Sequence, residues 1–118
     1  AAGKTSKSAG QIVASGILAN MLVCLAVWMA AGAKSAVDKV AVIVPPVAAF
    51  VALGLEHSIA NMSLLPLGLL AQAVTGAELP AGLSWSAAAG NLLWSTLGNI
   101  IGGGGFGLAY WALYLRGR

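Results

Sequence analysis

The feature that most constrains this chain is a run of residues without a single charge, from Ala9 to Ala33. A helix that crosses a bilayer core of about 30 Å needs about 20 consecutive apolar residues, and this run is long enough. The composition agrees, because 59% of the residues are hydrophobic and only 8% are charged. A water-soluble domain carries roughly a quarter charged residues. The sequence therefore predicts an all-α integral membrane protein.

Two further apolar regions follow, each after a short polar link. The first covers residues 40–74 and is interrupted by Glu56 and His57, so neither piece is long enough to span comfortably alone. We therefore predict one spanning segment that is broken near residues 55–58, as spanning segments of transporters often are. The other region covers residues 85–115 and can span with tilt. The predicted chain has three transmembrane spans, the middle one broken, at 9–33, 40–74 and 85–115.

Basic residues set the predicted orientation. The link after the first span carries Lys34 and Lys39, the C-terminal tail carries Arg116 and Arg118, and residues 75–84 contain no basic residue. The positive-inside rule then puts the first link and the C-terminus in the cytoplasm. We expect a multi-pass protein of the cell inner (plasma) membrane, surrounded by the lipid bilayer. The chain does not begin with Met and shows no signal peptide, so it reads as the back half of a larger protein.

Glu56 and His57 are the residues that most strongly indicate function. Ionisable side chains at membrane depth are costly and usually mark the path of an ion or proton. His57 is the only histidine, and its side chain titrates near neutral pH, so we predict a pore-lining residue rather than a packing residue. Glu56 could also line the pore, but its negative charge would repel an anion. We therefore favour a structural role, in which Glu56 pairs at a helix end or with a neighbouring subunit and steadies the break.

Other polar and aromatic residues could contribute to such a path. Asn20 lies in the middle of the first span, at a depth that should resemble that of His57. Phe50 precedes His57 by about two helical turns and could be a hydrophobic gate or a packing residue. Lys4 and Lys7 fall on the outer side, where they either attract anions to a channel mouth or form a solvated end. Amides within membranes commonly bond across helices, which is the expectation for Asn61, Asn91 and Asn99.

Several function classes are disfavoured by the same inventory. Six basic residues, scattered at the ends of apolar runs, do not form the clustered basic face of a nucleic-acid-binding protein. The lone His57 and the lone Cys24 do not stand at metal-ligand spacing, so no metal site is predicted. No nucleophile–base pair is evident, so we expect neither an enzyme nor a cofactor. The run Gly102–Gly105 instead predicts a close approach of two helices.

Three ordered motifs resemble the formate/nitrite transporter family. They are Asn20–Met29 (NMLVCLAVWM), Gly54–Met62 (GLEHSIANM) and Thr96–Gly103 (TLGNIIGG). The resemblance implies a homopentamer in which each protomer has its own pore. It also implies six helices per protomer, in two inverted three-helix repeats of aquaporin-like fold, with the second and fifth helices broken. Residues 1–118 would be the C-terminal repeat, whose partner is the missing N-terminal half of the same protomer.

The resemblance also implies residue roles and a substrate class. His57 matches the central pore histidine, Asn20 and Lys4 match polar residues of the substrate path, and Phe50 matches a constriction residue. Small monovalent weak-acid anions such as formate or nitrite would pass. Our own hypothesis is proton linkage through His57, because it avoids a bare charge in the constriction; the alternative is that a protonated imidazole pairs with the anion, which then crosses charged. The alternatives are a hydrosulfide-type channel of the same fold and a structural membrane subunit. A water or glycerol channel is disfavoured because no Asn-Pro-Ala motif is present. Residues expected to support the break are Glu56, Ser58 and Asn61.

Overall fold

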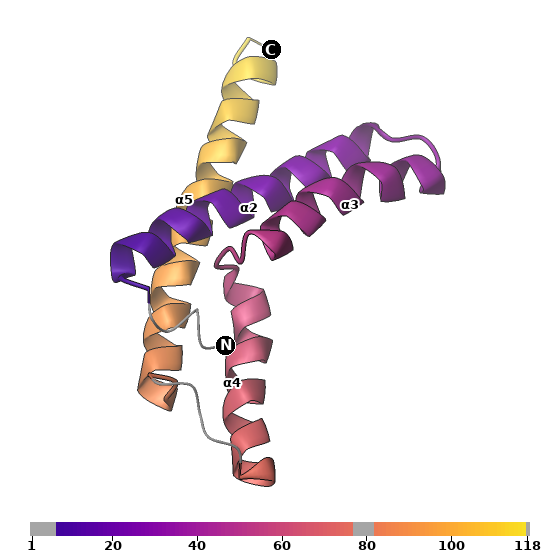
Figure 1. Cartoon of the computed structure of the whole chain (residues 1–118). Helices are drawn as coiled ribbons and strands as arrows, with labels where there is room; N and C mark the ends of the chain where they lie inside the picture. Colours follow the sequence, from indigo (N-terminus) through magenta and orange to yellow (C-terminus); the bar gives the residue numbers. More distant parts are fainter. Residues whose placement is uncertain (1–6, 77–81, 118) are drawn as a thin grey trace.

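The computed structural model describes residues 7–76 and 82–117 of the chain (Figure 1). Its regular structure in these residues is entirely helical, which confirms the all-α prediction. The middle apolar region is divided into two helices by residues 53–57, so the predicted break is also confirmed. The helices are α2 (Ala9–Gly32), α3 (Ala36–Ala52), α4 (Ser58–Thr75) and α5 (Trp85–Tyr114).

Local side-chain bonds define where the helices begin. At the start of α2, Ser8 and Gln11 form a capping box: the Gln11 N–H donates to Ser8 Oγ at 3.4 Å, and the Ser8 N–H donates to Gln11 Oε1 at 2.9 Å. Ser35 and Asp38 make the same reciprocal pair at the start of α3, with both bonds at 3.1 Å. Such caps satisfy backbone donors that have no partner within the helix. Ser84 caps α5 through a single bond, in which its Oγ accepts from the Ala87 N–H at 3.1 Å.

The break between α3 and α4 is encoded by a glycine. Gly54 has a φ of +59°, in the left-handed region that residues with a Cβ rarely adopt. The Gly54 N–H donates to the Val51 carbonyl at 3.0 Å, and the Leu55 N–H donates to the Phe50 carbonyl at 3.1 Å. This pair of bonds is the Schellman motif, which ends a helix while satisfying its last carbonyls. The chain therefore leaves α3 through a compact turn rather than a loose loop.

The helices form two antiparallel pairs that are set at a large angle to each other (Figure 1). α2 and α3 run side by side, as do α4 and the first half of α5. α5 crosses α2, and the second half of α5 extends past the crossing to the C-terminus. The break between α3 and α4 lies near this crossing, so residues from every described helix can meet there.

Glycines bring the backbones of α2 and α5 into contact at the crossing. A Cβ added to Gly16 would lie 3.0 Å from the Ser95 carbonyl oxygen. A Cβ on Gly98 would overlap the Val13 carbonyl, and one on Gly102 would overlap the Ile17 carbonyl. Gly98 and Gly102 are four residues apart, which is the spacing of small residues in closely packed membrane helices. The predicted close approach of the glycine run is thus confirmed at its first residue.

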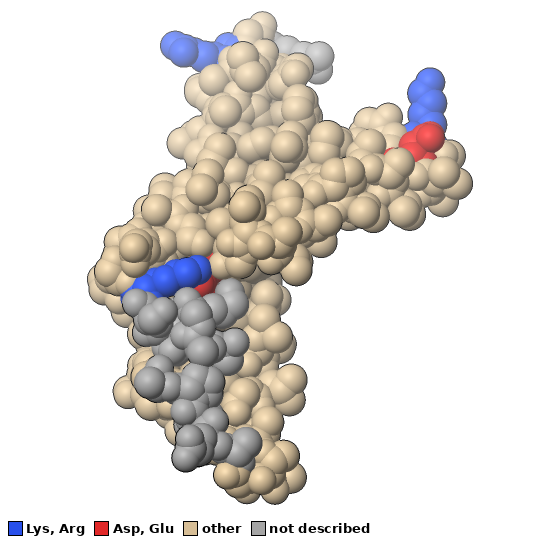
Figure 2. Space-filling model, in the orientation of Figure 1, with Lys and Arg blue, Asp and Glu red and all other residues tan. Residues whose placement is uncertain are grey.

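The outer surface of the described residues is strongly apolar. Most of their large aliphatic and aromatic side chains are exposed, and the buried apolar cluster is small: Leu65, Leu69, Leu83 and Ala88. α2 and α4 are long and apolar enough to cross a membrane. Figure 2 shows charged side chains at the far end of the α2–α3 hairpin, near the C-terminus of α5, and as a blue and red patch near the start of α2. Such a surface suits contact with lipid or with other apolar protein surfaces rather than with water.

Candidate functional site

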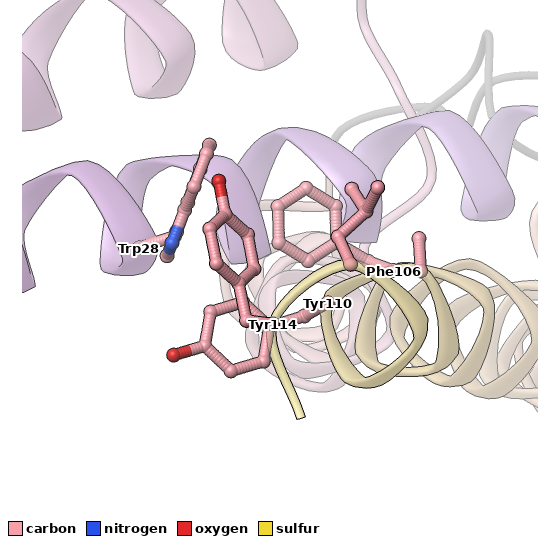
Figure 3. Close-up of a pocket in the computed structure, with 6 residues that line it drawn as sticks. Trp28, Phe106, Tyr110 and Tyr114 are labelled. Carbon is pink, nitrogen blue, oxygen red and sulfur yellow. The ribbon is translucent and has the colours of Figure 1, made fainter. Parts of the chain in front are cut away.

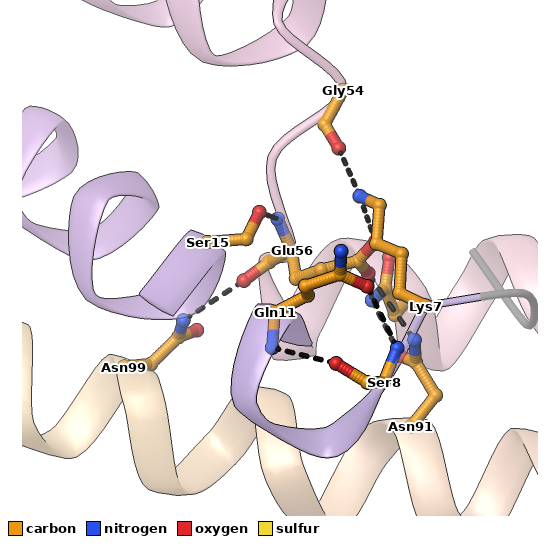
Figure 4. A network of polar contacts seen from close by, with 9 residues as sticks. Lys7, Ser8, Gln11, Ser15, Gly54, Glu56, Asn91 and Asn99 are labelled. Atoms are coloured by element: carbon orange, nitrogen blue, oxygen red, sulfur yellow. Dashed lines mark hydrogen bonds and ion pairs between the residues drawn. The ribbon is translucent and has the colours of Figure 1, made fainter. Parts of the chain in front are cut away.

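A cluster of polar side chains surrounds the α3–α4 break (Figure 4). It draws on the start of α2, the break itself, the first turn of α4 and the middle of α5. Glu56 lies at its centre, and its side chain is 0% exposed. A buried carboxylate is costly unless hydrogen bonds or an opposite charge compensate it. The surrounding residues supply both.

The Glu56 carboxylate receives donors on both of its oxygens. The Lys7 amine forms an ion pair with Oε1 at 2.7 Å. The Asn61 amide donates to Oε2 at 2.6 Å, and the Asn91 amide donates to the same oxygen at 3.3 Å. The Glu56 backbone N–H in turn donates to Ser15 Oγ at 3.0 Å. Lys7, just before α2, and the amides of α4 and α5 therefore hold the carboxylate, while Ser15 of α2 holds the Glu56 backbone.

Asn99 of α5 forms a second centre of the same cluster. Its Nδ2 donates to the carbonyl of Gly16 at 2.9 Å and to the carbonyl of Glu56 at 3.0 Å. Its Oδ1 accepts from both the backbone N–H and the Oγ of Ser58, each at 3.0 Å. Asn99 thus caps the start of α4 from another helix. The Asn61 amide also donates to Asn91 Oδ1 at 2.8 Å, so the expectation that Asn61, Asn91 and Asn99 bond across helices is confirmed.

His57 occupies the N-cap position of α4, but its side chain makes no capping bond. The imidazole is half-buried, and its ring centre lies 5.8 Å from that of Phe50, at an interplanar angle of 47°. The Nδ1 atom is buried and has no hydrogen-bond partner among the residues that the structure describes. Buried polar atoms are nearly always hydrogen-bonded in proteins. This nitrogen is therefore a candidate for contact with a bound or passing molecule, as is Asn61 Oδ1, which is also buried without a partner among the described residues.

The other predicted path residues lie at different distances from His57. Phe50, in the last turn of α3, is brought against it. Asn20 is half-buried, and its amide donates to the Asn99 carbonyl at 2.6 Å, which links it to the cluster from α2. Lys4 lies outside the described residues. The predicted supporting residues Glu56, Ser58 and Asn61 are all buried and all belong to the cluster.

The sequence analysis did not identify every member of the cluster. Lys7 was weighed only as a mouth or solvated residue, and Ser15 was not singled out. Asn91 was expected to bond across helices, but not to contact the carboxylate of Glu56. Lys7 and Glu56 are 49 residues apart, so their pairing leaves no local pattern in the sequence. These contacts depend on the crossing of α2 and α5, because the crossing determines which faces of the helices meet.

An apolar cleft of about 280 Å³ adjoins the break, between α2 and α5. Its walls include Leu53 and Leu55, which flank Gly54 at the break, and Phe106 of α5. Leu18, Met21, Leu22 and Leu25 complete the lining from α2. The cleft offers surface for apolar packing and no chemistry of its own.

Aromatic rings line a smaller pocket of about 130 Å³ near the C-terminal ends of α2 and α5 (Figure 3). Trp28 and Phe106 meet edge to face at 6.1 Å, and Tyr114 lies 6.1 Å from Trp28 and 5.0 Å from Tyr110. Amphipathic rings are enriched at the level of lipid headgroups. This pocket lies apart from the polar cluster and is interpreted as an anchoring feature.

Among the described residues, no group of histidine, cysteine and acidic side chains is arranged to hold a metal ion. The polar cluster offers one carboxylate, one amine, several amides and one imidazole. Such a set can bind or pass a small polar molecule, and the imidazole can exchange a proton with it.

Comparison with known proteins gives a consistent result. The sequence model of the family described as "Formate/nitrite transporter" matches residues 1–112. The "Formate channel FocA" of Escherichia coli (strain K12) is 43% identical over 123 aligned residues, which cover 90% of this chain and 41% of that protein. The chain therefore spans about two fifths of the length of this relative.

Two solved structures are also similar to the chain. A "Pentameric formate channel with formate bound" superposes with a TM-score of 0.82 at 44% identity, covering 97% of this chain and 49% of that one. An "FNT family ion channel" gives a TM-score of 0.77 at 36% identity, covering 93% and 42% respectively. The fold of the chain is thus about half of the fold of these channels.

Proposed function

Because the chain belongs to the formate/nitrite transporter family, we propose that the protein to which it contributes passes small monovalent weak-acid anions across a membrane. Formate is the first candidate substrate, because the relative and one of the solved structures described above are formate channels. Nitrite and hydrosulfide are the alternative substrates. The single observation that carries the proposal is the half-buried imidazole of His57, at a helix break, with a buried nitrogen that has no partner among the described residues.

The second element of the proposal is proton linkage through His57. A charged species in an apolar constriction is expensive, by several kcal/mol or more. The Phe50 ring lies against His57 and makes this part of the path apolar. An imidazole that hands a proton to the anion lets it cross this ring as the neutral acid and takes the proton back afterwards. In the alternative route, a protonated His57 pairs with the anion, which then crosses charged.

The ends of the broken helices contribute to anion attraction in this proposal. α4 begins at Ser58, directly after His57, and the N-terminus of a helix carries a partial positive charge. Asn20 and Lys4 belong to the path, with Lys4 on the outer side. Phe50 acts as the constriction. Glu56, Ser58 and Asn61 hold the break in shape.

The assembly is proposed to be a homopentamer in which each protomer holds its own pore. One similar solved structure is described as pentameric, and this chain covers about half of it. The other half of each pore wall then comes from the N-terminal part of the same protomer. The apolar cleft beside the break is one of the surfaces that this part would cover. The protein spans the inner (plasma) membrane with its C-terminus in the cytoplasm, as the distribution of basic residues indicates.

The test is formate uptake by liposomes that contain the full-length protein. We expect uptake to saturate with formate, to be inhibited by nitrite and hydrosulfide if these share the path, and to rise with an inward proton gradient. Replacement of His57 by Asn, which has a polar side chain that does not titrate, should abolish the response to the gradient. Uptake that ignores the proton gradient and is unchanged by His57→Asn would falsify proton linkage. An absence of anion flux altogether would favour a structural membrane subunit instead.

A further inference from the structure

Lys7 holds two parts of the break at once (Figure 4). Its amine donates to the carbonyl oxygen of Gly54 at 3.0 Å and pairs with Glu56 Oε1 at 2.7 Å. Lys7 lies directly before Ser8, the capping residue of α2. Its side chain is 29% exposed, whereas that of Glu56 is fully buried. The amine therefore connects the start of α2 to a carboxylate that water cannot reach.

The position of Glu56 creates an electrostatic problem for anion passage. Glu56 immediately precedes His57 in the chain, and His57 is the residue proposed to contact the substrate. In a low-dielectric interior, two like charges within several ångströms repel each other far more strongly than in water. An uncompensated carboxylate here would oppose the approach of any anion to His57. The neighbouring amides of Asn61 and Asn91 donate hydrogen bonds to it but carry no net positive charge.

We propose that Lys7 sets the charge selectivity of the path by cancelling the charge of Glu56 from within the same three-helix unit. The ion pair lets Glu56 keep its structural bonds to α4 and α5 while presenting no net negative charge beside His57. This inference rests on the proposed function, because it concerns the same path. In this proposal Lys7 neutralises the Glu56 carboxylate, whereas a lysine at a channel mouth would attract the anion itself.

The decisive feature of this proposal is that Lys7 acts through Glu56. Replacement of Lys7 by Met keeps an unbranched side chain that is one atom shorter but removes its charge, which leaves the carboxylate less compensated. Replacement of Glu56 by Gln in the same protein then removes the excess negative charge. A lysine that worked by attracting anions directly would not be replaced by this second change. The two roles therefore predict opposite outcomes for the double variant.

The experiment measures formate uptake by liposomes that contain the full-length protein, over a range of formate concentrations. For Lys7→Met we expect the half-saturating formate concentration to rise by about fivefold or more, because the anion is repelled near His57. For the double variant Lys7→Met/Glu56→Gln we expect a return to within about twofold of the wild type. Lys39→Met, which removes the same charge at an exposed position of α3, is the matched control and should leave this concentration unchanged.

The shape of the saturation curve separates this effect from loss of folded protein. Fewer folded channels lower the maximal rate but leave the half-saturating concentration unchanged. A Lys7→Met variant in which only the maximal rate falls would therefore overturn the inference. A double variant as impaired as Lys7→Met would overturn it as well. Wild-type protein that passes no formate would overturn the proposed function and this inference together, so the two failures can be told apart.

Discussion

At the crossing of α2 and α5 the helices meet through glycines, whereas around the α3–α4 break the same helices meet through amides and a carboxylate. Gly16 belongs to both regions: a Cβ there would lie 3.0 Å from the Ser95 carbonyl oxygen and 3.1 Å from Asn99 Nδ2. The close approach of the backbones is what allows the short side chain of Asn99 to reach the Gly16 carbonyl. The glycine contact therefore sets the distance between the two helices, and that short distance allows the polar side chains to bond across it.

The largest effect is expected from adding a single methyl group at the crossing. Gly98→Ala would drive its Cβ into the Val13 carbonyl, and backbone atoms cannot rotate away. The helices must then separate, which should destabilise the protein by about 2–3 kcal/mol. The measurement is the free energy of unfolding of the detergent-solubilised protein in a denaturant titration.

Gly104→Ala is the matched control for this prediction. An added Cβ there meets nothing within 4 Å in this chain, although Gly104 belongs to the same glycine run. We expect a change of about 0.5 kcal/mol or less. Equal destabilisation of the two variants would contradict the idea that α5 is packed at Gly98 and open at Gly104. It would mean that Gly104 is covered by a part of the protein outside these residues.

The next largest effect is expected in the polar region, from Asn99→Leu. This change removes the donor to Gly16 and Glu56 and the acceptor for Ser58, and it leaves buried polar groups without a partner. Each such group costs about 1–3 kcal/mol, so we expect a loss of at least about 2 kcal/mol. Amide hydrogen exchange should also accelerate at the start of α4. Ile100→Leu, at the exposed neighbouring position, should change neither measurement.

A smaller effect is expected from Asn91→Leu. Asn91 donates to Glu56 Oε2 at 3.3 Å and accepts from the Asn61 amide at 2.8 Å, but that amide still donates to the same Glu56 oxygen, so we expect a loss of about 1 kcal/mol. The effect should shrink when Glu56 is already Gln, because the two residues act together. A double-mutant cycle of unfolding free energies measures this coupling. Strictly additive values would show that Asn91 stabilises α5 independently of the carboxylate.

The smallest effect is expected far from both regions, at the start of α3. Ser35→Ala removes a capping box at an exposed helix end and should cost about 0.5 kcal/mol. Hydrogen bonds from the side chain and backbone of Ser35 hold the pKa of Asp38 below its ordinary value of 3.8. The stabilisation that the Asp38 carboxylate contributes is therefore complete at neutral pH and is lost as the pH falls through its folded-state pKa, whereas the bond from the Asp38 N–H to Ser35 Oγ does not titrate. Thermal melting at several acidic pH values, with and without Ser35→Ala, checks both statements.

The sequence predicted those features of the fold that depend on neighbouring residues. Charge-free stretches indicated the helices, and Glu56 with His57 indicated the break. The glycine run indicated close packing, although only the structure separates Gly102, which touches α2, from Gly104, which does not. These features could be predicted because hydropathy and backbone preferences act over a few residues.

The site was predicted less completely because it is built from distant residues. His57, Phe50 and the supporting residues of the break were identified from one short stretch and from a family resemblance. The pairing of Lys7 with Glu56 and the contact of Asn91 with the same carboxylate were not identified. Both depend on which helix faces meet, and the α2–α5 crossing decides this. A hydropathy pattern gives the apolar length of a helix but not its rotation about its own axis.

The reciprocal bonds at Ser8 and Ser35 and the turn at Gly54 join residues that lie close together in the sequence. Asn99, in contrast, bonds to Ser58, Glu56 and Gly16, which precede it by 41, 43 and 83 positions in the sequence. During synthesis, the start of α2, the start of α3 and the break can therefore take shape as soon as each leaves the ribosome. The carboxylate cluster cannot form until α5 has been made and has packed against α2 and α4. A chain that stops before α5 would keep its turns but lack Asn91 and Asn99, so the cluster forms only when α5 is present.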